Sequence, residues 1–358
     1  MAKPSGSESR FPRTLWKGTK LLRKDHCVIL PRPTKGWRLG SLAGIPERLL
    51  KALEGVSPLN HQWSDRFDHT LRRDEPRYAD GWLYLLRATR DDFGQFGHVL
   101  ARSSGYYGIG FRKNILYLLP PRSSAAVGGL VSDIEYICST VEQISGKSII
   151  LKQVDSSLAL ALLNSGHFKT AEDWTDRKLL EDEAYPEKLI DLDRLFAGSG
   201  DINSSAHNFR RKVIRFTRSC EGLVDAPIDK TISKIADWAG PIGDKLMSYR
   251  LMIQAVSRAN PFSERTYFSR IYQNIRGPID GIYIAQRLHG RTAGLYCAIT
   301  SKSWNGLTEW MDASFFRDLW EVGIGKLLLG GSETEGVVRY IRKLPTERPS
   351  ITSQPLVY

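Results

Sequence analysis

The amino-acid sequence predicts an α+β protein in which one type of unit occurs twice in tandem, with mixed, mainly antiparallel sheets flanked by helices. Strand-like runs separated by Gly and Ser turns indicate antiparallel strands, and longer segments with an apolar period of 3.6 residues indicate helices. An order of strands, helix, strand and helix ends near residue 170, and a similar order then recurs. The length of 358 residues also favours two domains over one.

The first unit is predicted to span residues 25–175, after a flexible basic arm over residues 1–24 that holds seven Lys or Arg and one acid. Its predicted elements are a strand over 26–31, a short helix over 45–56 that ends at Gly55, a helical or extended segment over 78–89, a meander of antiparallel strands over 96–121, a long helix over 128–146, a strand over 147–154 and a short helix over 156–166.

Apolar spacing and capping residues define the two later helices of this unit. The long helix is indicated by four apolar residues that share one face: Leu130, Ile134, Ile137 and Val141. In the short helix, Ser156 or Ser157 is the candidate N-cap and Gly166 is the candidate stop.

The second unit is predicted to span residues 176–358 and to carry the transfer site. Its predicted elements are helices over 186–198 and 204–219, a helical stretch over 228–256 with a break at Gly240–Pro241, a strand series over 280–314 with a turn at 289–291, and a strand, a Gly-Gly turn and a helix over 323–345.

The helix predicted over residues 204–219 carries five cations between Arg210 and Arg218. One face bears an apolar stripe made by Phe209, Val213 and Phe216, which predicts that the helix docks on a core. Another face bears a row of cations made by Arg210, Arg211, Arg215 and Arg218. This row predicts contact with the phosphates of an RNA, because phosphate contacts position RNA without reading its sequence. The alternative is a solvated face paired with acids such as Asp191 and Asp193.

The charge balance points in the same direction. The formal net charge is +12 and the pI is about 9.5, which favours an anionic partner such as nucleic acid, a membrane surface or a phosphorylated cofactor. The alternative is a generally basic protein without such a partner.

Other classes of site and segment lack support in the sequence. The four cysteines are scattered, which predicts neither a zinc site nor a disulfide framework, and the histidines show no metal-ligand spacing. No apolar run reaches the roughly 18 residues that a membrane-spanning helix needs, and no secretory signal follows the N-terminus. We therefore expect a cytoplasmic protein without an integral membrane segment, a metal or a cofactor.

Three stretches resemble one family of transferases. Residues 280–300 are similar to the paired strands with a Gly at their turn in acetyltransferase-like (GNAT) folds. Residues 327–345 resemble the closing strand, Gly-Gly turn and basic helix of the C-terminal catalytic domain of phosphatidylglycerol lysyltransferases, which are related to FemABX-type ligases. Residues 189–219 are similar to the family's segment in which a leading helix ends in Gly and a basic helix follows.

The resemblance implies two tandem GNAT-like domains and an activity. That activity is the transfer of an amino acid from a charged tRNA to a hydroxyl or amine of a small-molecule, peptide or lipid acceptor. An aminoacyl ester is already activated, so catalysis needs positioning, stabilisation of an oxyanion and one proton transfer, without an enzyme nucleophile or a metal.

The resemblance also implies a set of site residues. Lys343 and Arg342 are candidates to stabilise the oxyanion, Glu309 to orient the α-amine or to act as a base, and Arg339 to bind the tRNA. The turn Gly330–Gly331–Ser332 offers free N–H groups to an anion. The alternatives are a solvated basic helix face, a surface carboxylate and a simple turn. The sequence departs from the family at Ile341, where Lys is common, and at Asp312, where Arg is expected.

Two further functions compete with this one. The first is an acyl-CoA-dependent N-acyltransferase of the same fold. Such enzymes carry an Arg/Gln-x-x-Gly-x-Gly/Ala pyrophosphate loop before a helix, and the sequence has no clean copy of it. The second is a non-enzymatic RNA-binding module.

Overall fold

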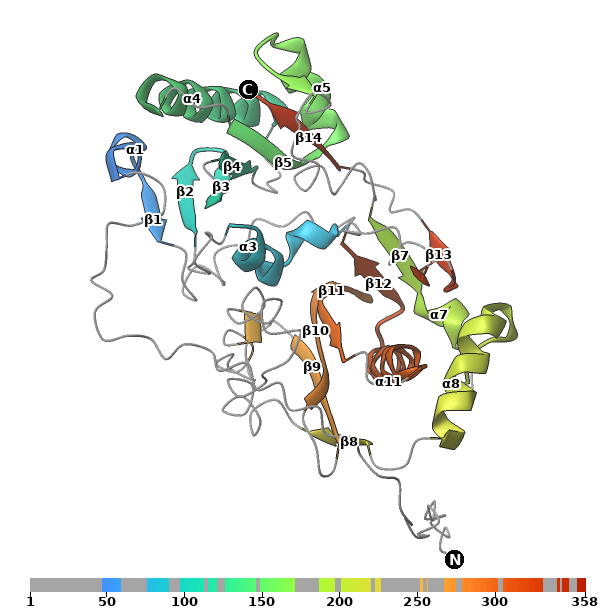
Figure 1. The fold of residues 1–358 in the computed structure, drawn as a ribbon. Helices are drawn as coiled ribbons and strands as arrows, with labels where there is room; N and C mark the ends of the chain where they lie inside the picture. The colour runs from blue at the N-terminus through green and yellow to red at the C-terminus, as the bar shows by residue number, and fades with distance from the viewer. Residues whose placement is uncertain are drawn as a thin grey trace, which may run out of the picture. The chain divides into compact units, whose positions relative to one another are not determined.

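Two seven-stranded sheets organise the part of the chain that the computed structural model describes (Figure 1). The chain divides into two units, residues 1–40 and Ser41–Tyr358, and every described residue lies in the second. The described residues are 47–58, 76–89, 97–112, 115–120, 126–145, 149–170, 187–196, 201–219, 223–226, 252–253, 256, 267–274, 279–301, 305–330, 340–341, 343–347 and 353–358. The predicted basic arm, the strand over 26–31 and most of the helical stretch over 228–256 fall outside them.

Each sheet has a clear strand order. The first sheet runs β1 (Val56–Pro58), β2 (His98–Arg102), β3 (Gly105–Arg112), β4 (Ile115–Leu119), β5 (Ile149–Asp155), β14 (Ser353–Val357) and β6 (Lys169–Thr170). The second runs β8 (Leu223–Ala226), β9 (Tyr267–Asn274), β10 (Ile279–His289), β11 (Thr292–Thr300), β12 (Lys326–Leu329), β7 (Lys188–Asp191) and β13 (Thr346–Glu347).

The two sheets repeat one pattern position by position. In each, three consecutive antiparallel strands are followed by a helix that returns the chain to a parallel fourth strand. The returning helix is α4 (Val127–Ser145) in the first sheet and α11 (Leu307–Glu321) in the second. The other strand pairs are antiparallel. The predicted α+β class with two similar, mainly antiparallel units is therefore confirmed.

The last strand of the chain crosses back to the first sheet. β7 opens the second predicted unit and lies in the second sheet, next to β12. β14 is the last strand of the chain but lies in the first sheet, where Leu356 pairs with Leu151 of β5. The division between residues 175 and 176 stays a prediction, and the part of the chain after it supplies β14 to the sheet that the part before it forms.

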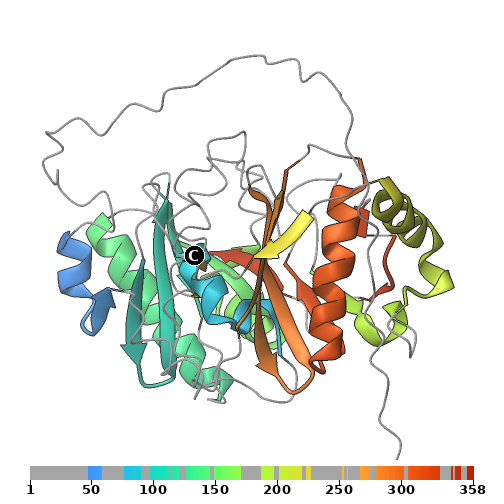
Figure 2. The ribbon, with the colours of Figure 1, turned by 90° about the horizontal axis from the view of Figure 1, so that it is seen from below.

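Helices cover both faces of the two sheets (Figure 2). On the outer face of the first sheet, α4 packs together with α1 (Glu47–Ala52) and α5 (Ser156–Asn164). A central core joins both sheets to η1 (Tyr78–Asp80) and α3 (Trp82–Ala88). On the outer face of the second sheet, α11 packs with α7 (Leu192–Leu195) and α8 (His207–Ser219), which follows η4 (Ser204–Ala206).

Several predicted elements are present as expected. The helix over 45–56, the strand meander, the long helix, the following strand and the turn at Gly290 all occur, and the segment over 78–89 is helical. The predicted stripe of the long helix is fully inside the core, because Leu130 is 3% exposed and Ile134, Ile137 and Val141 are 0% exposed.

Three predictions of local structure are wrong. Residues 188–191 form β7 rather than a helix, because they pair with β12 on one side and β13 on the other. The strand series was expected to reach residue 314, but α11 begins at Leu307 as the crossover that a parallel strand requires. The N-cap of α5 is Asp155 rather than a serine, since its carboxylate accepts a 2.9 Å hydrogen bond from the Leu158 amide. In the described part of the chain, no helix is long and apolar enough to cross a membrane.

Candidate functional site

Helix α8 docks on α11 through its apolar stripe. Phe209 and Phe216 are buried, with exposures of 0% and 3%. Val213 is partly buried and packs against the same core. α8 and α11 lie side by side in both views (Figures 1 and 2). The stripe predicted from the sequence is therefore confirmed, and it brings one flank of α8 over the first turns of α11.

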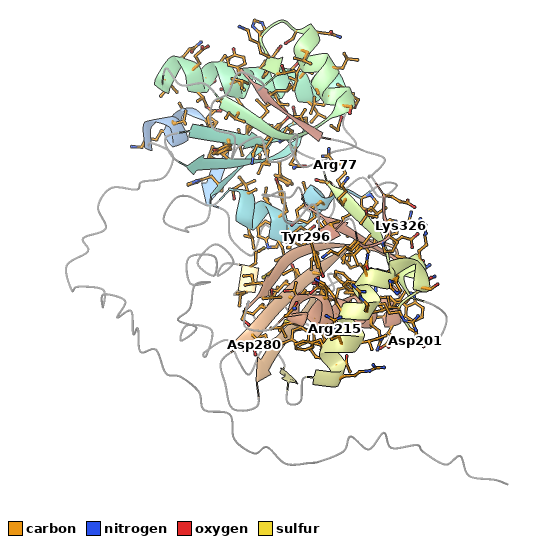
Figure 3. The ribbon with its side chains drawn as sticks, turned by 45° about the vertical axis from the view of Figure 1, so that its right-hand side comes forward. Arg77, Asp201, Arg215, Asp280, Tyr296 and Lys326 are labelled. Carbon is orange, nitrogen blue, oxygen red and sulfur yellow. The ribbon has the colours of Figure 1, made fainter. Side chains whose placement is uncertain are left out.

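The arginine row lies on the outer side of α8. Its members, Arg210, Arg211, Arg215 and Arg218, are all exposed, and Figure 3 shows Arg215 among them. The two acids considered as their partners contact other groups. Asp191 accepts from the Arg194 amide at 2.9 Å, and Asp193 lies 2.7 Å from Nη2 of Arg291.

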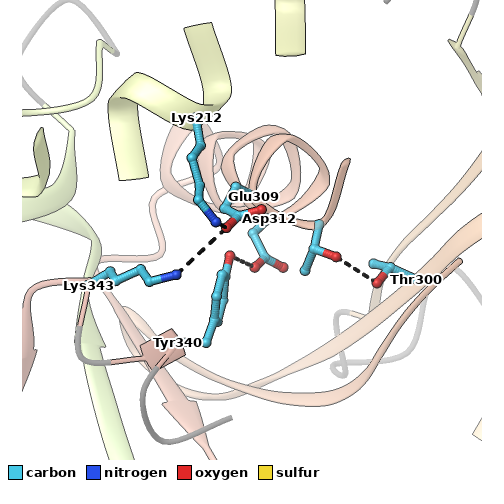
Figure 4. Close-up of polar contacts among 7 residues, drawn as sticks. Lys212, Thr300, Glu309, Asp312, Tyr340 and Lys343 are labelled. Carbon is cyan, nitrogen blue, oxygen red and sulfur yellow. Dashed lines mark hydrogen bonds and ion pairs between the residues drawn. The ribbon is translucent and has the colours of Figure 1, made fainter. Parts of the chain in front are cut away.

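Lys212 is the cation of α8 that turns inward. Its ammonium forms an ion pair with Oε1 of Glu309 in the first turn of α11 (Figure 4). Glu309 is only 4% exposed, so the alternative of a surface carboxylate is wrong. Lys343 reaches the same oxygen from the segment after β12, with its Nζ 3.9 Å away. One buried carboxylate therefore holds two ammonium groups near each other.

The surroundings of the Lys343 ammonium disfavour its charged form. Partial burial lowers the pKa of Lys343, the positive charge of Lys212 lowers it further, and Glu309 opposes both. The Lys343 ammonium also lies 5.1 Å above the ring of Tyr340. About a third of the Lys343 side chain is exposed.

A second carboxylate lies one helical turn further along α11. Asp312 is 5% exposed and accepts a hydrogen bond of 2.7 Å from the hydroxyl of Tyr283 on β10. Its other oxygen accepts from the hydroxyl of Tyr340 (Figure 4). Burial raises the pKa of Asp312 to about 6, although the two phenol hydrogen bonds lower it and nearby Glu309 raises it. Burial and the adjacent carboxylate raise the pKa of both tyrosines as well.

Local structure fixes the start of α11 and hence both carboxylates. Gly306 precedes the helix with a φ of 90°, a conformation that other residues rarely adopt, and its Cα faces Phe216 of α8. In the first turn, the hydroxyl of Thr308 lies 2.9 Å from that of Thr300 on β11. Glu309 and Asp312 are three residues apart, so they lie on one face of the helix.

Two tyrosine rings pack where the pairing of β11 and β12 ends. The strand pairing ends at Leu295 and Leu329, and beyond it the rings of Tyr296 and Tyr78 pack with centroids 4.7 Å apart. The Tyr296 hydroxyl donates to the carbonyl of Tyr78 at 2.6 Å. Gly330 lies against the Tyr78 ring, where a Cβ would approach within 2.5 Å.

The predicted site residues divide into three groups. The structure brings Glu309 and Lys343 together. Gly330 packs at the Tyr78 contact, apart from that pair. Arg339, Arg342, Gly331 and Ser332 lie outside the described residues, so their roles stay predictions. Lys343 itself follows the helical residues Tyr340 and Ile341 in a turn.

Four residues of the cluster were missed by the sequence-based prediction: Lys212, Tyr283, Asp312 and Tyr340. For Lys212 a signal existed, because it is three residues after Phe209 and four before Phe216 and so shares their face. Asp312 was noted only as a departure from the family. The two tyrosines carry no local signal.

No protein-family model and no curated protein matches the sequence. Among solved structures, a conserved protein of unknown function from Bacteroides thetaiotaomicron matches with a TM-score of 0.60 and 12% identity, over 84% of this chain and 98% of that one. L-PGS from Bacillus licheniformis matches with a TM-score of 0.55 and 14% identity, over 84% of this chain and 92% of that one.

A third match is the C-terminal domain (DUF2156) of a putative lysylphosphatidylglycerol synthetase from Agrobacterium fabrum, with a TM-score of 0.47 and 12% identity, over 73% of this chain and 83% of that one. Similarity at these identities concerns the fold. At the level of the fold, the match to L-PGS agrees with the resemblance seen in the sequence, and the two similar sheets have the tandem GNAT-like architecture that this resemblance implied.

Proposed function

We propose that this chain is an aminoacyl-tRNA-dependent aminoacyltransferase, which moves an amino acid from a charged tRNA to a hydroxyl or amine of a small-molecule, peptide or lipid acceptor. The observation that carries the proposal is the buried Glu309 with Lys212 and Lys343 on it, beside the row of exposed arginines on α8. Because charged tRNA is made and used in the cytoplasm, the reaction belongs there.

The lysine pair suits the chemistry of an activated ester. Attack on the ester carbonyl produces an oxyanion, and fixed positive charge near that oxygen stabilises the transition state. Glu309 holds Lys343 and Lys212 in place through its own buried charge. Glu309 also balances the two cations when no substrate is present, which limits the cost of burying them.

Helix α8 supports an RNA donor because one side exposes arginines and the other side contacts the buried Glu309. Exposed Arg211 and Arg215 face outward, while Lys212 between them points to Glu309. A phosphate backbone bound along the outer side would end close to the lysine pair. Phosphate contacts of this kind fix the position of a nucleic acid without reading its sequence.

Two observations weigh against acyl-CoA as the donor. The connections that lead into α4 and α11, residues 120–126 and 301–306, carry no Arg/Gln-x-x-Gly-x-Gly/Ala pattern in their sequence. The buried rings of Tyr78 and Tyr296 pack directly beyond the end of the β11–β12 pairing. A non-enzymatic RNA-binding module has no need of a buried carboxylate under two lysines, one of which has a lowered pKa.

The test uses purified protein and aminoacyl-tRNAs labelled in the amino acid, one amino acid at a time. Binding is measured for charged and uncharged tRNA, and ester loss is measured with mixed amine and hydroxyl acceptors and with anionic lipid vesicles. We expect one group of charged tRNAs to lose the label to an acceptor faster than by spontaneous hydrolysis, and Glu309→Gln to abolish the difference. Equal ester loss with and without the protein for every amino acid would overturn the proposal.

A further inference from the structure

The two buried carboxylates of α11, Glu309 and Asp312, are satisfied in different ways. Glu309 is paired with two ammonium groups, whereas no described residue places a cation against Asp312. Both oxygens of Asp312 instead accept hydrogen bonds from phenols, one from Tyr283 and one from Tyr340. A buried carboxylate held only by neutral donors takes up a proton more readily than one in an ion pair.

Among the residues that the structure describes, three elements place side chains near Asp312. β10 contributes Tyr283 and the segment after β12 contributes Tyr340, while Glu309 is the like charge on α11 itself. The neighbouring Tyr272 of β9 directs its hydroxyl to the carbonyl of Met311, 3.4 Å away. The two lysines engage Glu309, whereas burial raises the pKa of Asp312 to about 6.

The two phenols differ in their access to a ligand. Tyr283 is 0% exposed, and its ring is packed against Phe315 and Tyr272 inside the core. Tyr340 is half-buried and lies beside Lys343, whose ammonium is 5.1 Å from its ring. A phenol that donates its proton to Asp312 keeps lone pairs with which it can accept another hydrogen bond. Tyr340 is thus the phenol through which a ligand at Lys343 can reach Asp312.

We propose that Tyr340 and Asp312 form a proton relay that deprotonates the acceptor nucleophile during aminoacyl transfer. This inference rests on the proposed function and adds a second half to the site. In this arrangement the lysine pair binds the carbonyl oxygen of the ester, and the relay accepts the proton that the nucleophile loses. Tyr340 is the catalytic residue that touches the nucleophile, and Asp312 acts through it.

The steps of the relay balance. The nucleophilic nitrogen or oxygen forms a bond to the ester carbonyl while its proton moves to Oη of Tyr340, and the original phenol proton moves to Oδ2 of Asp312. The carbonyl π electrons move to the oxygen beside Lys343. When the carbonyl re-forms, the bond to the tRNA ribose oxygen breaks, and the proton returns through Tyr340 to that oxygen. Asp312 ends ionised, as it began, and no further reactant is needed.

The experiment compares the pH dependence of kcat/KM in the wild type with three variants. Tyr340→Phe keeps the ring beside Lys343 and removes the relay hydroxyl. Asp312→Asn keeps the shape and removes the titrating group. Tyr283→Phe is the matched control, because it removes a phenol hydrogen bond to the same carboxylate from the side that a ligand does not reach.

We expect wild-type kcat/KM to rise through about pH 6 and then level off. General acid–base groups contribute about 10²–10⁴-fold, so Tyr340→Phe and Asp312→Asn should lower kcat by that factor, and Asp312→Asn should lose the inflection. Tyr283→Phe should keep its plateau within a few-fold and move the inflection to higher pH, because the ionised carboxylate loses a donor. Activity of Tyr340→Phe near the wild-type level, or an unchanged inflection in Asp312→Asn, would overturn the relay and leave the proposed transferase intact.

A second measurement is independent of turnover. The ¹³Cζ resonance of Tyr340 in the full chain reports whether its hydrogen bond follows the ionisation of Asp312. We expect a shift with a midpoint of about pH 6 that disappears in Asp312→Asn. A resonance that does not change between about pH 4 and 8 contradicts a coupled pair, whether or not any aminoacyl-tRNA is a substrate. Absence of transfer by the wild type, with the shift present, counts against the proposed function alone.

Discussion

Lys212 of α8 is ion-paired with Glu309 of α11, and this contact joins the helix that bears the exposed arginines to the helix that bears both buried carboxylates. The pair spans 97 residues of sequence. Glu309 is almost fully enclosed, whereas the Lys212 side chain is 39% exposed. The contact therefore couples an open surface of α8 to a closed part of the site.

Removing Lys212 should destabilise the fold. Among the described residues, Lys212→Met leaves the buried Glu309 with Lys343 at 3.9 Å as its one cation, and we expect the free energy of unfolding to fall by about 1–3 kcal/mol, the range for an unsatisfied buried group. Lys212→Met/Glu309→Gln should recover part of that loss. Arg211→Met, on the exposed side of α8, is the matched control, with a change within about 0.5 kcal/mol. Urea denaturation measures all four proteins. Equal losses for the Arg211 and Lys212 variants would contradict a structural role for the ion pair.

The exposed arginines should make tRNA binding sensitive to salt. If several of them contact phosphates, the affinity should fall by about a decade or more between roughly 50 and 200 mM salt. Arg211→Glu/Arg215→Glu should weaken all tRNAs about equally, because backbone contacts carry no sequence information. Lys169→Glu/Lys326→Glu is the charge-matched control at exposed positions outside α8. Fluorescence anisotropy gives these affinities, and binding that is flat with salt or equally weak in the control would remove α8 from the RNA interface.

Lys343 should act on the transition state more than on binding. One lost charge-assisted contact to an oxyanion costs about 10²–10³ in kcat. Lys343→Ala should therefore lower kcat by that factor while the affinity for charged tRNA stays within a few-fold. Weaker tRNA binding with a normal kcat would assign Lys343 to RNA docking. Arg342, the other cation predicted for this role, lies outside the described residues and can be compared in the same assay.

Much of the fold could be predicted because its signals are local. The stripe of Phe209, Val213 and Phe216 is a property of one helix, and it also fixes the inward direction of Lys212. The interpretation of residues 188–191 failed because Leu189, Leu192 and Leu195 have helical spacing, whereas pairing with two other strands decides the structure. A short stretch of sequence does not reveal strand partners that lie far away along the chain.

The site could be predicted only in part, for the same reason. Glu309 and Lys343 were identified through the resemblance to a family, not through spacing. The pairing of Asp312 with Tyr340 depends on how the segment after β12 returns to α11, and the pairing with Tyr283 depends on which face of β10 meets that helix. No periodicity within either segment specifies those contacts.

The return of β14 to the first sheet should make the two sheets unfold together. Leu356 of β14 is 0% exposed in the core of the first sheet, and Leu356→Ala should cost about 2–5 kcal/mol. Because the first sheet then holds β14 less firmly and the second sheet shares the central core, hydrogen exchange should accelerate in β3 and in β10 alike. Leu160→Ala, at a side chain that is 61% exposed, is the control without effect. Faster exchange in β3 with unchanged exchange in β10 would show that the two sheets unfold separately.

Asp312 should make stability depend on pH in a direction opposite to that of a salt-bridged aspartate. Its pKa is raised from 3.8 to about 6 in the folded chain, so the folded state binds the proton more tightly than the unfolded state. The resulting stabilisation is fully present below about pH 4 and is lost as the pH rises through about 6. At 1.36 kcal/mol per pKa unit, the loss is on the order of 3 kcal/mol by about pH 7.5.

The substitution Asp312→Asn isolates this effect from all other titrating groups. The amide can accept from Tyr283 and donate to the Tyr340 hydroxyl, so both hydrogen bonds are retained in an uncharged form. We expect the free energy of unfolding of the variant, relative to the wild type, to increase by on the order of 3 kcal/mol between about pH 4 and pH 7.5. Urea denaturation of both proteins across this range measures the difference. A difference that is constant with pH would mean that Asp312 keeps an ordinary pKa and that its two phenols, or water, compensate its buried charge in full.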